Sequence, residues 1–235
     1  YSYSSYFLPH IFYYNIKSSK VQLLFFSFSY KIISYYVQYI RLFFQEVFLM
    51  DSIIFDVDGT LWDSTGIVAE AWADYLTNTE HMDTDVSAKR LMGLFGQLLP
   101  DIARALFPEF PESEQLRIID GCCQAEHEAL LRKCAPLYPQ LEETLKILSS
   151  RFPLFIVSNC QAGYIEVFLK STGFGHYFKG HLCPGDTGMA KAENIMKIRD
   201  DFHLSDPVYV GDTLGDFNAC RKAGVPFIFA EYGFG

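Results

Sequence analysis

Four short apolar runs recur in residues 50–235, and their spacing constrains the fold more than any other feature of the sequence. Residues 52–57 (SIIFDV) are mostly β-branched or aromatic and lead directly into Asp58-Gly59-Thr60. Runs of the same kind occupy residues 154–157, 208–210 and 227–229. Amphipathic segments of helical length lie between them, at residues 141–149, 164–171, 192–199 and 216–223. Because strands that alternate with helices form parallel sheets, we predict an α/β fold with a doubly wound parallel sheet.

A long segment without a convincing strand follows the first run. Residues 64–135 are far longer than an ordinary connection between two strands of one sheet. Apolar residues recur at helical spacing in residues 67–77, 87–91, 98–106 and 113–132. We therefore predict an inserted α-helical cap domain at residues 64–135, with residues 50–63 and 136–235 forming the α/β core.

The first 49 residues differ in composition from the rest of the chain. They contain no Gly, Ala, Asp or Thr, and Phe, Tyr, Ile, Lys, Asn and Ser dominate them. Charges at Lys17, Lys20, Lys31 and Arg41 interrupt every apolar stretch that could span a membrane. A transit peptide stays open as an alternative, although such peptides carry more Arg. An adenine- and thymine-rich untranslated stretch gives this composition when it is read as protein, so we expect residues 1–49 to be a non-native leader and Met50 the true start.

The charge balance limits the partners that this chain can have. Its formal net charge is −9, although residues 1–49 hold more basic than acidic residues, so the remainder is more acidic than the whole. An acidic surface repels nucleic-acid phosphate and anionic lipid. We expect no nucleic acid and no membrane among the partners, and a small phosphorylated metabolite or a metal ion instead.

The six cysteines show no CxxC pair and no histidines at zinc-ligand spacing. Free thiols in a reducing compartment are the simpler interpretation. We therefore expect a cytoplasmic protein, and we expect it to be a monomer or a weak homodimer.

Two carboxylates stand at the end of the first apolar run. Asp56 and Asp58 are two residues apart, so the period of a strand directs both toward the same side. Gly59 then supplies a tight turn and Thr60 a hydroxyl. One carboxylate can act as a nucleophile and the other as an acid. We predict that Asp56 stays ionised when it binds a metal ion and that its neighbours raise the pKa of Asp58.

A carboxylate that attacks a phosphate dianion needs positive charge nearby. The repulsion amounts to several kcal/mol where the effective dielectric constant is about 20 rather than 80. Asp212 and Asp216, in GDTLGD, are hard oxygen ligands suited to magnesium, and Lys191 supplies an ammonium group. We predict a Mg²⁺ site formed by Asp56, Asp58, Asp212 and Asp216.

The second apolar run ends in Ser158-Asn159, whose hydroxyl, amide and backbone N–H groups can bind phosphoryl oxygens. Together with residues already named, they complete the predicted phosphate-binding set, which is Gly59, Thr60, Ser158, Asn159 and Lys191.

Four motifs in this order resemble the haloacid dehalogenase superfamily of phosphatases. They are DVDGTLWDS at residues 56–64, Ser158-Asn159, Lys191 and GDTLGD at residues 211–216. The resemblance covers essentially all of residues 50–235 and implies a Rossmann-like core with a nucleophilic Asp56 and an acid/base Asp58. It also implies a Mg²⁺ ion held by Asp56, the Asp58 backbone carbonyl and Asp212, with Asp216 nearby, and phosphate held by Lys191 and Ser158.

The same resemblance also indicates one particular group within the superfamily. In the dehalogenases themselves the position two after the nucleophile is not an acid, so Asp58 favours the phosphatases. The helical insert resembles the cap of phosphoglycolate phosphatases and β-phosphoglucomutases, and residues 187–195 are more similar to the phosphoglycolate phosphatase-like group.

Three functions remain open at this point. The leading prediction is a magnesium-dependent phosphatase that hydrolyses a small phosphomonoester, phosphoglycolate-like or a sugar phosphate, through an aspartyl-phosphate intermediate. One alternative is a β-phosphoglucomutase-like phosphomutase. The other is a non-catalytic binding protein with the same fold, which the presence of every expected catalytic residue disfavours.

Overall fold

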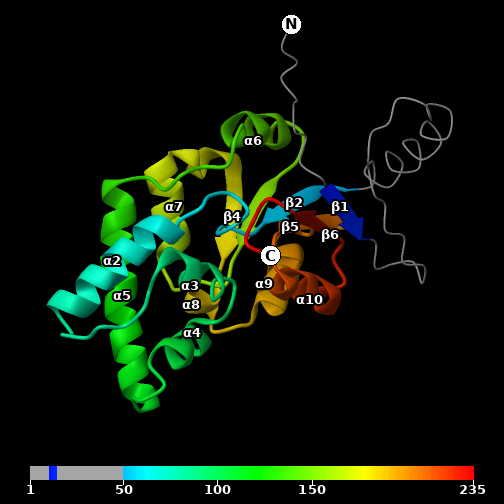
Figure 1. Cartoon of the computed structure of the whole chain (residues 1–235). Coiled ribbons are helices and arrows are strands. Elements are labelled where there is room, and N and C mark those ends of the chain that lie inside the picture. The colour runs from blue at the N-terminus through cyan, green and yellow to red at the C-terminus, as the bar shows by residue number, and fades with distance from the viewer. Residues whose placement is uncertain (1–10, 15–49) are drawn as a thin grey trace, which may run out of the picture.

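The computed structural model describes residues 11–14 and 50–235. The centre of this described part is a six-stranded sheet in the order β1-β6-β5-β2-β3-β4 (Figure 1). Its strands are β1 (Ile11–Tyr14), β2 (Ser52–Phe55), β3 (Leu154–Val157), β4 (Phe178–Leu182), β5 (Pro207–Gly211) and β6 (Phe227–Ala230). Strands β2 to β6 are parallel, and β1 runs antiparallel to β6. The rest of the predicted leader lies outside the described residues, so the division at Met50 stays a prediction.

Helices cover both faces of the sheet. They are α6 (Leu141–Ser149), α7 (Tyr164–Thr172), the short α8 (Pro184–Thr187), α9 (Lys191–Asp201) and α10 (Leu214–Ala223), with the 3₁₀ turn η1 (Phe174–Tyr177) after α7. Successive strand residues face opposite layers. Ile54 packs in the core layer of α9 and α10, whereas Ile53 and Phe55 pack in the layer of α6 and α7. Both layers are therefore apolar, and the predicted doubly wound α/β fold is confirmed.

Strand β4 is the one parallel strand that the apolar pattern did not predict. Its sequence is FKGHL, in which Phe178 alone is buried. An edge strand has only one neighbour and exposes much of its surface, so it does not need a continuous apolar run. The missing signal therefore follows from the position of β4 at the edge of the sheet.

The insert folds as four helices between β2 and α6. They are α2 (Thr65–Asn78), α3 (Ala88–Met92), α4 (Leu99–Leu106) and α5 (Glu112–Arg132). In Figure 1, α2 and α5 lie side by side, away from the sheet. Trp72 and Leu76 of α2 and Ile118 of α5 are buried in this bundle, and each such side chain contributes about 1.5–3 kcal/mol by burial. The helices match the predicted segments, while their assignment to a separate domain stays a prediction.

The strand register brings the motif residues to one edge of the sheet. Phe55 of β2 pairs with Ile156 of β3 on one side and with Val210 of β5 on the other. Since the three strands are parallel, the residues that follow them leave the sheet at the same level. Residues 56–60, 158–159 and 211–216 therefore meet at the carboxyl edge of the sheet, beneath the helical insert.

Candidate active site

Lys191 connects two carboxylates at this edge. It is the first residue of α9, and its Nζ donates to Oδ1 of Asp56 over 3.0 Å and to Oδ1 of Asp216 over 2.5 Å. The Lys191 side chain is 3% exposed and the two acids are equally inaccessible. Buried charges are tolerated only when they are paired. The two ion pairs therefore fix the ammonium group beside the predicted nucleophile.

Asp216 also stabilises the first turn of α10. Thr213 is the residue that caps this helix, and its Oγ1 accepts from the backbone N–H of Asp216 over 3.1 Å. In return, Oδ2 of Asp216 accepts from the backbone N–H of Thr213 over 2.9 Å and from its Oγ1 over 2.7 Å. This is a capping box. It directs Oδ2 to the helix end and leaves Oδ1 for Lys191.

Asp212 is held from two sides. Thr60 Oγ1 donates to its Oδ1 over 3.2 Å, and the backbone N–H of Phe234 donates to its Oδ2 over 2.7 Å. Gly59 passes so close that a Cβ there would overlap the Asp212 carboxylate, and its φ of 79° lies in the left-handed region. Only glycine meets both conditions at low cost. Thr60 thus contacts the acid predicted to bind metal.

Two of the three buried acids, Asp56 and Asp212, have too little positive charge around them. Burial raises the pKa of Asp56 to about 8, with Asp216 and Asp212 adding to the rise and Lys191 opposing it. Burial also raises the pKa of Asp212 to about 6. For Asp216, burial acts in the same direction, but Lys191 and the hydrogen bonds from Thr213 together lower the pKa.

A divalent cation fits this cluster. Carboxylate oxygens of Asp56, Asp212 and Asp216 lie within 4.8 Å of one another, and Lys191 is their common counter-charge. Hard carboxylate oxygens in such a group suit Mg²⁺. Because Oδ1 of Asp216 is engaged with Lys191, Asp56 and Asp212 are the more available ligands.

Asp58 lies on the cap side of Asp56. Its Oδ1 accepts three hydrogen bonds, from Trp62 Nε1 over 2.9 Å, from Ser64 Oγ over 2.5 Å and from the Tyr164 hydroxyl over 2.6 Å. Burial raises its pKa, and these bonds limit the rise because they stabilise the ionised form. The predicted direction of the shift agrees, although burial rather than neighbouring acids is its main cause.

The two residues after β3 face different partners. Ser158 is buried, and its hydrogen bond with Asp56 works against the rise in that pKa. Asn159 donates from Nδ2 to the backbone oxygen of Gly96 in the cap over 2.8 Å. Its Oδ1 is buried without a hydrogen-bond partner in the described part of the chain. Asn159 therefore bridges core and cap, and its phosphate-binding role stays a prediction.

Several residues around the site were not expected from the sequence. Phe234 reaches Asp212 through its backbone, and Tyr164 reaches Asp58 from the first turn of α7. Glu126 of α5 is 3% exposed; its Oε2 accepts from Trp72 Nε1 over 2.6 Å and its Oε1 from Gln161 Nε2. One signal was present in the sequence, because Glu126 recurs at helical spacing with Cys122 and Leu130, on a buried face.

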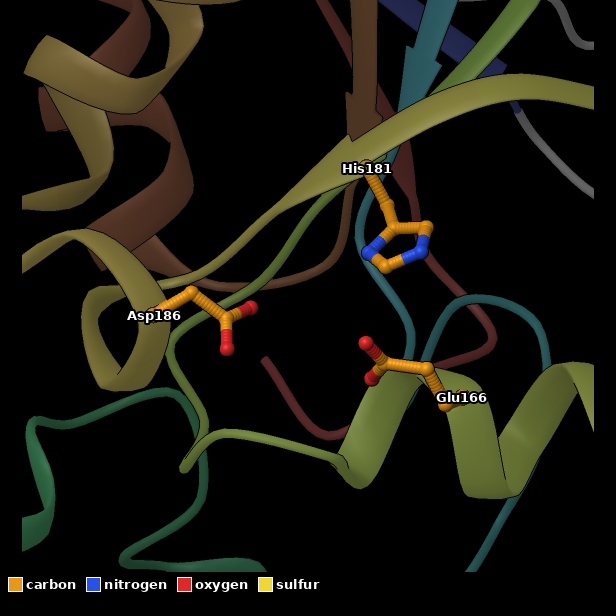
Figure 2. A group of neighbouring side chains, drawn as sticks. All are labelled: Glu166, His181 and Asp186. Atoms are coloured by element: carbon orange, nitrogen blue, oxygen red, sulfur yellow. The ribbon is translucent and has the colours of Figure 1, made fainter.

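A second cluster of possible ligands lies apart from this site. Glu166 of α7, His181 of β4 and Asp186 of α8 point toward one another (Figure 2). Both acids are exposed to solvent, which screens their repulsion. Burial distinguishes the group of Asp56, Asp212 and Asp216, in which charge has to be neutralised within the protein.

The state of the cysteines and the character of the helices, in the described residues, agree with what the sequence predicts. The cysteines form no disulfide, and burial raises the pKa of Cys160, so this thiol beside Asn159 is not an activated nucleophile. No described helix combines the length and the apolar character that crossing a membrane requires.

The fold and the site define a doubly wound α/β protein with a helical cap and a buried carboxylate cluster at its strand ends. The model of the haloacid dehalogenase-like hydrolase family matches residues 53–230. The chain belongs to this family.

Relatives of known name agree with this assignment. A phosphoglycolate phosphatase from Pseudomonas fluorescens is 25% identical over 198 residues, which cover 77% of this chain and 70% of that protein. One from Shigella boydii is 23% identical over 205 residues, with 77% and 81% covered. The chain is thus a phosphatase similar to the phosphoglycolate phosphatase group.

Solved structures show the same architecture. A haloacid dehalogenase-like hydrolase from Streptococcus pneumoniae is 26% identical and superposes with a TM-score of 0.63, covering 75% of this chain and 82% of that one. A structure titled as a predicted phosphatase from Clostridium acetobutylicum gives a TM-score of 0.67 at 20% identity, over 80% and 87% of the two chains.

Proposed function

We propose that this enzyme hydrolyses a small phosphomonoester through a covalent phosphate on Asp56, with Mg²⁺ as its cofactor. The observation that carries the proposal is the position of Asp56, a buried carboxylate paired with Lys191 and adjacent to Asp58 under the cap. Nucleophile, counter-charge and proton donor thus come from one edge of the sheet.

The reaction has two balanced steps. A carboxylate oxygen of Asp56 forms a bond to phosphorus while the ester P–O bond breaks, and Asp58 gives its proton to the departing alcohol oxygen. A water molecule then attacks phosphorus and loses a proton to Asp58, while the bond to Asp56 breaks and inorganic phosphate leaves. Asp58 suits both steps because burial raises its pKa.

Other residues hold the phosphoryl group and exclude water. Lys191 and Ser158 form hydrogen bonds with Asp56, and Gly59 allows the backbone to approach the carboxylate cluster closely. Bound Mg²⁺ would neutralise the negative charge shared by the acids and the phosphoryl oxygens. The cap closes over the edge of the sheet through the Asn159 bond to Gly96, which limits access to small substrates.

We also propose a cellular compartment and an oligomeric state. Six thiols without a disulfide suit a reducing compartment such as the cytoplasm, where phosphorylated metabolites are available as substrates. We take the working form to be a monomer or a weak homodimer.

An aryl phosphate assay tests the mechanism. The parent protein should release phosphate from 4-nitrophenyl phosphate with Mg²⁺ and lose this activity in EDTA. Asp56→Asn should reduce kcat by about 10³-fold or more, because the nucleophile is removed. Asp74→Asn, on the exposed side of α2, is the matched control and should keep the parent rate. Equal rates for the parent and Asp56→Asn would exclude the covalent mechanism.

A further inference from the structure

A partly open chamber lies between the cap and the core, next to Asp58. Its volume is about 30 Å³, and its polar lining comes from Asp58, Glu126, Asn159, Gln161 and Tyr164. Such a volume holds about two water molecules. The alcohol part of a substrate whose phosphorus sits at Asp56 has to occupy this chamber, since Asp58 must reach its oxygen.

The side-chain donors around the chamber are already engaged. Trp72 Nε1 and Gln161 Nε2 both donate to Glu126, and the Tyr164 hydroxyl donates to Asp58. Asn159 directs its Nδ2 to the cap at Gly96.

The side chains that line the chamber offer hydrogen-bond acceptors to a ligand. Asn159 Oδ1 is buried without a partner in the described residues, and the carboxyl groups of Glu126 and Asp58 stand on the same lining. The lining residues include no lysine or arginine. Lys191 is engaged by Asp56 and Asp216. Toward these side chains a ligand must therefore supply the hydrogens, and it finds no lysine or arginine to balance a negative charge.

We infer that the leaving alcohol carries a hydroxyl or ammonium donor and no carboxylate. The inference deepens the proposed function and rests on it. It separates this enzyme from the substrate named for its phosphoglycolate phosphatase relatives, because the carboxylate of a glycolate group would face two carboxyl groups and no lysine or arginine in a narrow chamber. The protein gives independent support, since burial raises the pKa of Glu126 to about 8, so even its own carboxylate is poorly stabilised there.

Three substrates of nearly equal size test the inference. They are 2-aminoethyl phosphate, 2-hydroxyethyl phosphate and phosphoglycolate, which differ at the end of a two-carbon alcohol. With Mg²⁺ present, kcat/KM for the better of the first two should exceed that for phosphoglycolate by about tenfold or more, which corresponds to about 1.4 kcal/mol. The ratio between the first two distinguishes a cationic donor from a neutral one.

The outcomes separate the inference from the proposed function. Phosphoglycolate hydrolysed as well as the best of the other two overturns the inference. Hydrolysis of 4-nitrophenyl phosphate but of none of the three also overturns it, while the mechanism stands. A protein inactive on all four compounds refutes the proposed function itself.

Glu126→Gln identifies the residue responsible. The variant replaces the carboxyl group by an amide of nearly the same shape, and Gln161 can rotate its own amide to present an oxygen to the new donor. The ratio of kcat/KM between the donor-bearing substrate and phosphoglycolate should fall several-fold. Glu128→Gln, an exposed change two residues away on α5, is the control and should leave the ratio unchanged. An unchanged ratio in a folded Glu126→Gln protein contradicts the assignment, and if that variant does not fold, the three-substrate series on the parent decides.

Discussion

At the scale of single residues, the site depends on close backbone approach as much as on charged side chains. Asp212 receives one of its two hydrogen bonds from the backbone of Phe234. Gly233, immediately before it, lies against the Gly59 carbonyl and the Asp212 side chain, where a Cβ would overlap both. A residue without a side chain is therefore needed for residues 232–235 to reach the proposed metal ligand.

Gly233→Ala should raise the Mg²⁺ concentration needed for half-maximal activity by about tenfold, because the displaced segment no longer orients Asp212. Mg²⁺ titration of aryl phosphatase activity measures this. Gly66→Ala is the control, since nothing lies within 4 Å of a Cβ there, and it should leave the Mg²⁺ requirement unchanged. A normal requirement in Gly233→Ala would mean that Asp212 keeps its position without this segment.

At the scale of elements, α10 links helix stability to catalysis. Its capping box uses Oδ2 of Asp216, while Oδ1 of the same carboxylate holds Lys191. The helix terminus therefore fixes the rotamer of an active-site acid. A substitution of Thr213, which caps α10, should therefore affect Asp56 through Asp216 and Lys191, although Thr213 contacts neither Asp56 nor Lys191.

Thr213→Ala should destabilise the protein by about 1 kcal/mol, the usual cost of losing such a cap. It should also lower kcat/KM for aryl phosphate, because two of the three hydrogen bonds between residue 213 and Asp216 are lost. Urea unfolding and steady-state kinetics measure the two effects. Thr213→Ser retains the hydroxyl and should stay close to the parent in both. Activity that is unaffected in Thr213→Ala would show that Lys191 does not depend on the capping box.

At the scale of the whole molecule, the buried acids connect stability to pH and metal. Asp56 and Asp212 have pKa values of about 8 and about 6 in the folded protein, against 3.8 for an ordinary carboxyl of this type. Between these values the unfolded chain has lost protons that the folded protein retains. In the absence of metal, the free energy of unfolding therefore falls as pH rises from about 4 to about 8.

Saturating Mg²⁺ should counter this loss, because it stabilises the ionised carboxylates that only the folded state brings together. The gain in Tm over an EDTA sample should be larger at about pH 8 than at about pH 5. Thermal unfolding followed by circular dichroism checks this, and Asp212→Asn should lose most of the gain. An equal gain at both pH values would indicate that Mg²⁺ binds elsewhere.

The sequence by itself determined the order of strands and helices and the identity of the motif residues. Apolar periodicity is local, so residues 141–149 predicted α6 to the residue, and the other helices follow their patterns closely. The residues predicted for the site follow the same logic, because each of them except Lys191, the first residue of α9, lies within a few positions of a strand end. The edge strand β4 was missed since only Phe178 needs burial there.

The tertiary structure alone decided which distant residues complete the site. Glu126 and Asp58 come from segments 68 residues apart in the chain, and Phe234 and Asp212 meet through a backbone N–H that carries no sequence signature. These contacts arise when the cap folds over the edge of the sheet and when residues 232–235 return to it. Periodicity cannot encode them, because it describes which side of an element is buried and not which other element covers that side.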